Sequence, residues 1–94
     1  MSDLKRLVLD VLKPHNPSII DVAQQLSILD GVSGVNISIK EVDQETETVK
    51  ITIKGDSIDY ELVEETIREA GAVIHSVDNV SAGKELVDEL ETQD

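Results

Sequence analysis

The feature that most constrains the fold is a pair of alternating stretches, residues 35–40 and 49–54. Each places a β-branched residue at every second position, and an acidic, turn-like stretch separates the two. A period of two is typical of a strand with one buried face. The apolar members are Val35, Ile37, Ile39, Val49, Ile51 and Ile53. The sequence therefore predicts an antiparallel hairpin with one apolar and one polar face.

A strand and a helix precede this hairpin. Residues 4–12 are apolar at both odd and even positions, which is typical of a central strand that is covered on both sides. Asn16 is the predicted N-cap of a helix whose first residue is Pro17. Gly31 is the predicted end of that helix, because glycine accommodates the left-handed turn after a helix.

A second helix and a last strand follow the hairpin. Asp59 is the predicted N-cap, and Ile58 and Val63 have the spacing of a hydrophobic staple across the helix start. Gly71 ends the helix. Residues 72–80 form the last predicted strand, in which the alternation is weaker than in the others.

This order of elements predicts an α+β fold of the ferredoxin-like type. Two strand–helix–strand units with right-handed crossovers give a four-stranded antiparallel sheet with two helices on one face and the first and third strands in the middle. We assign residues 1–80 to this domain. Residues 81–94 form an acidic C-terminal extension, either a short helix or an extended arm, which we expect to contact a neighbouring subunit.

Composition narrows the classes of function. The chain has 94 residues and a formal net charge of −12, which argues against a nucleic-acid partner because phosphates require a basic surface. It has no cysteine, hence no disulfide framework or thiol nucleophile. No apolar run approaches the length of a membrane helix and no signal peptide is recognisable, so we expect a cytoplasmic protein without a membrane partner.

The charges of the predicted sheet suggest an interface. With both helices on one face, four of the eight Lys and Arg residues gather on the opposite, open face, whereas the second helix and the tail are acidic. This segregation predicts head-to-tail association of identical subunits, although solvated lysines would give the same pattern. Exposed Val8 and Leu12 favour the interface. The predicted interface residues are Arg6, Val8, Leu12, Lys40, Lys50, Thr52 and Lys54.

Candidate metal ligands lie in two places. Carboxylates at Glu41, Asp43, Glu45 and Glu47 alternate through the hairpin tip, and calcium or magnesium prefers such oxygen ligands. The loop pattern of an EF-hand is absent, so a solvated, charge-repelling tip is the preferred interpretation of these acids.

The last strand contributes His75 and Asp78 as further candidates. If Ile74 faces the core, His75 lies on the open face with Val73 and Val77, where it could bind an anion, a metal or a neighbouring subunit's carboxylate. The opposite register makes it a partly buried histidine at the sheet edge. His15 is interpreted as a turn residue. The sequence contains no nucleophile elbow, phosphate-cradling glycine loop or His-x-x-x-His pair, so no catalytic residue is predicted.

Several runs carry a resemblance to a known family. They are Arg-Leu-Val-Leu-Asp-Val-Leu-Lys-Pro at 6–14, Gly-Val-x-Gly-Val-Asn-Ile at 31–37, Ile-His-Ser-Val-Asp at 74–78 and Val-x-x-Gly at 80–83. Together they resemble the small archaeal proteins of domain-of-unknown-function family 211. The resemblance implies a ferredoxin-like subunit, rings of about seven or eight copies, an archaeal cytosolic origin, a tail that reaches a neighbour and no assigned activity.

From these observations we expect a homo-oligomeric, ring-forming binding or scaffold protein. Two alternatives stay open at this point. One is a sensor of a small molecule or divalent cation with ligands at the subunit interfaces. The other is an enzyme with an interface active site around His75.

Overall fold

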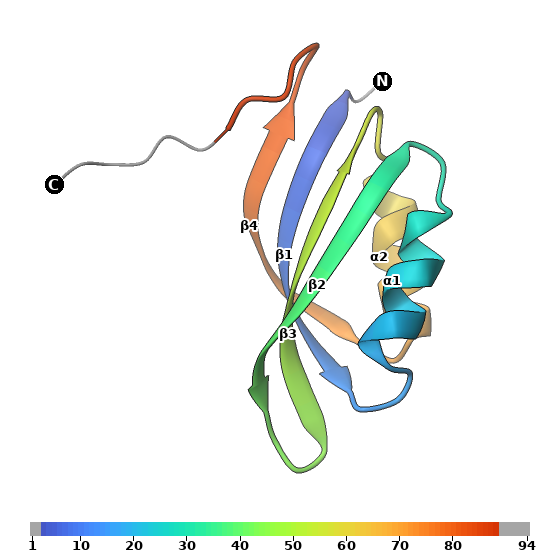
Figure 1. Cartoon of the computed structure of the whole chain (residues 1–94), viewed down its shortest axis with the longest axis vertical. Helices are drawn as coiled ribbons and strands as arrows, with labels where there is room; N and C mark the ends of the chain where they lie inside the picture. The colour runs from blue at the N-terminus through green and yellow to red at the C-terminus, as the bar shows by residue number, and fades with distance from the viewer. Residues whose placement is uncertain (1–2, 89–94) are drawn as a thin grey trace, which may run out of the picture.

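The computed structural model describes residues 3–88 and shows a four-stranded antiparallel sheet with two helices on one face (Figure 1). The elements are β1 (Leu4–Pro14), α1 (Ile19–Ser27), β2 (Val32–Val42), β3 (Thr46–Gly55), α2 (Tyr60–Glu69) and β4 (Val73–Ala82). The strand order is β2-β3-β1-β4, so the first and third strands lie in the middle as predicted. The predicted ferredoxin-like α+β fold is confirmed.

The core lies between the helices and the inner face of the two central strands. Leu9 is paired with Ile51 in the regular β1–β3 ladder, and both side chains are fully buried. Val22 and Leu26 of α1 and Val63 and Ile67 of α2 pack against them as one cluster. The period of two in the strands and the helical spacing of these residues therefore face each other across a single aliphatic core.

Helix α1 begins later than the sequence suggested. The N-cap is Ser18, whose hydroxyl accepts a hydrogen bond from the backbone N–H of Asp21, so the prediction of Asn16 as the cap is wrong. Serine caps a helix as well as asparagine does, so the two residue types alone do not decide between the positions. Pro17 follows a cis peptide bond and precedes the cap.

Helix α2 begins as predicted. The Asp59 carboxylate accepts hydrogen bonds from the N–H groups of Glu61 and Leu62, and Ile58 and Val63 on either side of the cap are both fully buried. Gly71 follows the helix with a φ of 81°, which is the left-handed conformation expected of a glycine that ends a helix. Neither helix in residues 3–88 has the length and hydropathy needed to cross a membrane.

Bulges in β4 account for the weak alternation of apolar and polar residues in its sequence. The ladder of β4 with β1 shifts register three times, and two of these shifts leave His75 and Asp78 as the extra residues of bulges in β4. Opposite the buried row of β1, the partners are Ile74, Val77 and Val80, at intervals of three residues. The expectation that Val77 shares the open face with His75 is therefore wrong, because a bulge between them reverses the side on which Val77 lies.

The chain beyond β4 is only partly described. The strand itself continues to Ala82, two residues past the predicted domain boundary, and residues 83–88 are neither helix nor strand. The predictions about the C-terminal extension also concern residues 89–94, which lie outside the described part of the chain.

Close packing of two backbone segments fixes the end of β3. A β-carbon on Gly55 would fall on the carbonyl oxygen of Gly31, which accepts a hydrogen bond from the N–H of Asp56. Only a residue without a side chain fits at this contact. Gly34, in the neighbouring strand β2 and opposite Lys54, has nothing within 4 Å of the corresponding position. Helix α1 ends at Ser27, so the prediction that Gly31 ends it is wrong, and Gly31 lies in the turn that leads into β2.

We expect Gly55→Ala to destabilise the fold by more than about 3 kcal/mol, since the new methyl group must push backbone against backbone. Gly34→Ala is the matched control and should change the free energy of unfolding by less than about 1 kcal/mol. Urea unfolding followed by circular dichroism measures both. Equal stability of the two variants would contradict the close contact.

Candidate functional site

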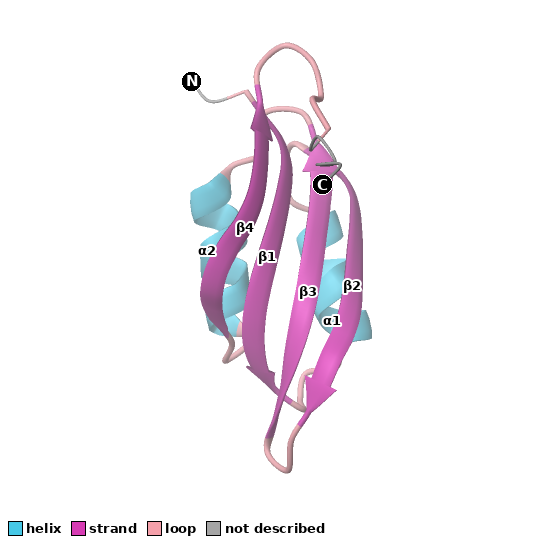
Figure 2. Cartoon of the chain, turned by 90° about the vertical axis from the view of Figure 1, so that its left-hand side faces the viewer, coloured by secondary structure: helices cyan, strands magenta, loops and turns pink. Residues whose placement is uncertain are grey.

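The face of the sheet away from the helices is the candidate functional surface, and we call it the open face. Figure 2 shows the sheet from this side, with both helices behind it. The β1–β3 register places Arg6 opposite Lys54, Val8 opposite Thr52 and Asp10 opposite Lys50. These residues alternate with the buried row, so they point away from the core, as the sequence predicted.

A shallow groove of about 470 Å³ lies on this face, and we call it the basic groove. It is lined by Arg6, Val8, Lys40, Lys50, Thr52, Lys54, Asp78, Asn79 and Asp88. Six of the seven predicted interface residues are among them. The structure therefore brings together side chains from all four strands and from the segment that follows β4.

The segment 83–88 folds back to this groove. Arg6 donates from Nη1 to the Asp88 carboxylate at 2.8 Å and from Nη2 to the Val87 carbonyl at 3.3 Å. The N–H of Val87 in turn donates to the buried Ser81 hydroxyl at 3.0 Å. A carboxylate of the acidic tail thus lies against a guanidinium of the open face within one chain.

A second cavity of about 600 Å³ lies farther along the open face and contains His75. Its lining is Asp10, Val11, Leu12, Lys40, Glu41, Thr48 and His75. The Lys40 ammonium lies 4.0 Å from the Asp10 carboxylate. Ile74 packs against the core, so His75 takes the open-face position that was one of its two expected orientations.

The candidate metal ligands are dispersed. Glu41 is opposite Thr48 on the open face, and Asp43 and Glu45 are exposed at the hairpin turn. Asp78 lines the basic groove and accepts a hydrogen bond from Ser76 at 2.7 Å. Within residues 3–88, no group of three or more His, Asp or Glu side chains is placed to hold a metal ion.

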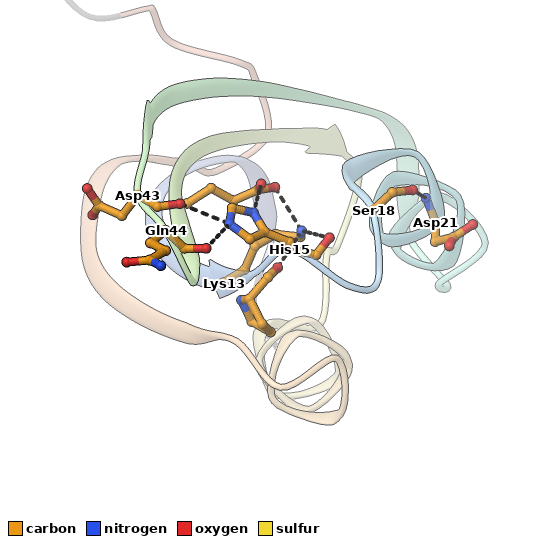
Figure 3. A network of polar contacts seen from close by, with 8 residues as sticks. Lys13, His15, Ser18, Asp21, Asp43 and Gln44 are labelled. Carbon is orange, nitrogen blue, oxygen red and sulfur yellow. Dashed lines mark hydrogen bonds and ion pairs between the residues drawn. The ribbon is translucent and has the colours of Figure 1, made fainter.

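Glu47 is part of a different structure, a partly buried ionic cluster with Lys13 and His15 on the inner face of the hairpin's far end. Figure 3 labels Lys13 and His15 of this cluster. The Glu47 carboxylate accepts hydrogen bonds from Lys13 Nζ and His15 Nδ1, each at 2.9 Å. Lys13 is only 1% exposed, and its ammonium also donates to the Pro14 carbonyl at 2.8 Å. A buried ammonium is tolerable only with such partners.

His15 connects this cluster to the hairpin turn. Its Nε2 lies 2.9 Å from the Asp43 carbonyl oxygen and 3.1 Å from that of Gln44. Both ring nitrogens therefore face acceptors, an arrangement that the doubly protonated imidazolium satisfies and the neutral ring does not. His15 is a turn residue, as interpreted, and it also holds the tip of the hairpin.

The pKa values of the cluster shift accordingly. The Glu47 hydrogen bond, aided by the Asp43 carbonyl, raises the pKa of His15 above its ordinary 6.5. The hydrogen bonds from Lys13 and then His15 lower the pKa of Glu47 below its ordinary 4.5. Both shifts favour the charged forms, so the three side chains stabilise one another as ions.

Sequence reasoning missed Lys13 and misplaced Glu47, although a signal was present. Lys13 continues the buried row of Leu7, Leu9 and Val11 by one more step of two, and Glu47 does the same before Val49. Opposite charges at the ends of two paired apolar rows indicate a buried ion pair. Reading Glu47 as a member of the acidic turn hid that pattern.

We expect Glu47→Ala to lower the free energy of unfolding by about 3 kcal/mol, because it leaves the Lys13 ammonium buried without a carboxylate. Glu45→Ala removes an exposed carboxylate from the same hairpin and should change it by less than about 0.5 kcal/mol. Urea unfolding at one fixed protein concentration measures both. A wild-type stability for Glu47→Ala would contradict the buried pair.

The cluster should also make stability depend on pH. Because folding raises the His15 pKa, its contribution is complete below pH 6.5 and declines as pH rises through the folded-state value. Because folding lowers the Glu47 pKa, its contribution is complete above pH 4.5 and declines as pH falls through the folded-state value. We expect the cluster to contribute most between these two values.

Urea midpoints between pH 5.5 and 9 check the histidine part of this dependence. His15→Gln should flatten the decline toward high pH, and His75→Gln, at the other histidine of the chain, should leave it in place. A decline that is unchanged in His15→Gln would show that the pH dependence has another source.

Two comparisons with known proteins agree, and each covers nearly the whole chain. The sequence model of the DUF211 family, described as uncharacterized ArCR, matches residues 5–94. The uncharacterized protein MJ0319 of Methanocaldococcus jannaschii is 47% identical over 92 residues, which cover 98% of this chain and 95% of that protein. The chain belongs to the archaeal DUF211 family.

Proposed function

We propose that the protein is a homo-oligomeric scaffold or binding protein whose subunits associate through the open face of the sheet. The observation that carries this proposal is an apolar pair on a face that neither α1 nor α2 covers. Leu12 and Val73 are directly opposite each other in the β1–β4 ladder and are 43% and 63% exposed. Large apolar side chains that adjoin on an uncovered sheet favour burial against another protein surface.

The distribution of charge supports the same surface and suggests what meets it. Arg6, Lys40, Lys50 and Lys54 line the basic groove, and they are half of the Lys and Arg residues in the chain. The exposed side of α2, in the other layer, carries Glu61, Glu64, Glu65 and Glu69. One subunit thus presents a basic surface and an acidic surface on opposite sides.

Opposite surfaces of complementary charge suit a head-to-tail contact. Such heterologous contacts close into a ring when the rotation between neighbours permits it. A ring of about seven or eight copies is what the family resemblance implies, and the proposed contact agrees with it. A cysteine-free chain suits the reducing cytoplasm, where we place the assembly.

Light scattering coupled to size-exclusion chromatography tests the proposal on the full chain at 0.15 M salt, on the order of physiological ionic strength. We expect a mass several times the 10.3 kDa of one subunit. Leu12→Glu places a charge in the apolar pair and should shift the population to the monomer while circular dichroism still reports a folded chain.

Ile20→Glu is the matched control, because Ile20 is an exposed isoleucine of α1 on the other side of the sheet. It should leave the mass unchanged. A monomeric wild type at tens of micromolar, on the order of concentrations at which weak assemblies still form, would overturn the proposal. If Leu12→Glu stays oligomeric, the subunits do not associate through the open face, and that part of the proposal is wrong.

A further inference from the structure

Two like charges face each other at one end of the basic groove. Arg6 and Lys54 are direct partners in the β1–β3 ladder, and both point to the open face. Like charges in this position repel and destabilise the strand pair. In a chain with only eight basic residues and a net charge of −12, such a pair is a costly placement unless an anion lies between them.

The surroundings of this pair add donors and leave it accessible. Lys50 and Thr52 project from β3 into the same groove. Gly34 is opposite Lys54 on the outer side, and the space where its side chain would be is open. Within residues 3–88, no carboxylate lies within ion-pairing distance of Lys50 or Lys54.

Arg6 shows which chemistry the groove accepts. Its side chain is 12% exposed, yet Asp88, its one carboxylate partner within residues 3–88, belongs to a segment without regular structure and is 79% exposed. The carboxylate engages Nη1 alone, and Nε is buried without a hydrogen-bond partner. A guanidinium favours bidentate contact with an anion. Here the carboxylate holds only Nη1 while Nη2 donates to the Val87 carbonyl, so part of the capacity for an anion is unused.

We infer that the Arg6–Lys54 end of the basic groove binds a compact anion with two or more negative charges, of the phosphate or polycarboxylate class. Arg6 and Lys54 hold the anion between them, and Lys50 and Thr52 add a charge and a hydroxyl donor. Asp88 occupies the site in the absence of the anion and competes with it. Every group comes from one chain, so the site forms within a single subunit. A neighbour docked on the open face would compete with the anion for it.

Isothermal titration calorimetry of the full chain at low ionic strength tests this site, with inorganic pyrophosphate and citrate as probes and acetate as the singly charged comparison. We expect one pyrophosphate or citrate per chain, little binding of acetate, and an affinity that falls as sodium chloride is added. Binding of pyrophosphate alone, or of citrate alone, assigns the site to the phosphate or to the carboxylate class.

Charge variants locate the site. Lys54→Gln removes an exposed ammonium and should weaken binding about tenfold, and Arg6→Gln should weaken it at least as much. Arg68→Gln makes the same change of charge on α2, behind the sheet, and should have no effect. Because Arg6→Gln could also disturb the fold, the effect of Lys54→Gln on affinity decides whether the anion binds at this site. Equal effects of Lys54→Gln and Arg68→Gln would overturn the site.

Removing the competing carboxylate of Asp88 should have the opposite effect on anion affinity. Asp88→Ala should tighten binding by about threefold or more, because the anion no longer displaces an internal ligand. Glu85→Ala removes an exposed acid of the same segment and should not. Absence of binding in both the wild type and Asp88→Ala would also overturn the inference.

The same titration is run on Leu12→Glu, in which the open face is not engaged by a neighbour, and light scattering is recorded in parallel. Binding to a wild type that proves monomeric would refute only the proposed assembly. Failure of Leu12→Glu to bind, in a protein whose wild type is oligomeric, would refute only the anion site.

Discussion

The structure depends on one constraint, which is that two short helices can cover only one face of a four-stranded sheet. The β1–β3 ladder supplies a dense aliphatic row beneath α1 and α2, and its inner residues are almost fully buried. Burial of these side chains is the main favourable term in a domain of this size. Everything that the other face carries is therefore free of a role in the core, and that face holds the cavities of about 470 and 600 Å³, each lined by charged side chains.

The bulges of the outer strands concentrate polar groups on that face. Where a bulge adds a residue, two successive side chains replace one opposite the partner strand. In β4 this places Asp78 and Asn79 together in the basic groove, and in β2 it places Lys40 beside Glu41 in the second cavity. The open face thus carries more charge for its area than a regular sheet of the same length would allow.

Sequence patterns predicted the parts of this protein that follow a single period. The strand order, the Asp59 cap and the inner rows of β1 and β3 could all be read from spacing. The start of α1 could not, because Ser18 and Asn16 are equally good caps by residue type, and the structure uses Ser18. The predicted face of the Val77 side chain was wrong, because two bulges in β4 place inward residues at every third position instead of every second.

The site was predicted to a similar extent. The residues of the basic groove followed from alternation once the helix side was known, but the contact of Asp88 with Arg6 joins residues far apart in sequence and has no local signal. The buried Lys13–Glu47 pair could have been predicted, because both residues continue the alternating buried positions of β1 and β3. The general expectation that charged residues near a turn are solvated argued against it.

The irregular ladders at both margins of the sheet have a further consequence. The central β1–β3 pairing runs without a shift, whereas the pairings of β2 and β4 are each interrupted more than once. An interrupted margin presents its free N–H and C=O groups out of step, so another chain cannot add to it as one continuous strand. Indefinite growth of the sheet into a fibre is thereby disfavoured, and a protein that exposes two long margins can remain dispersed at high concentration.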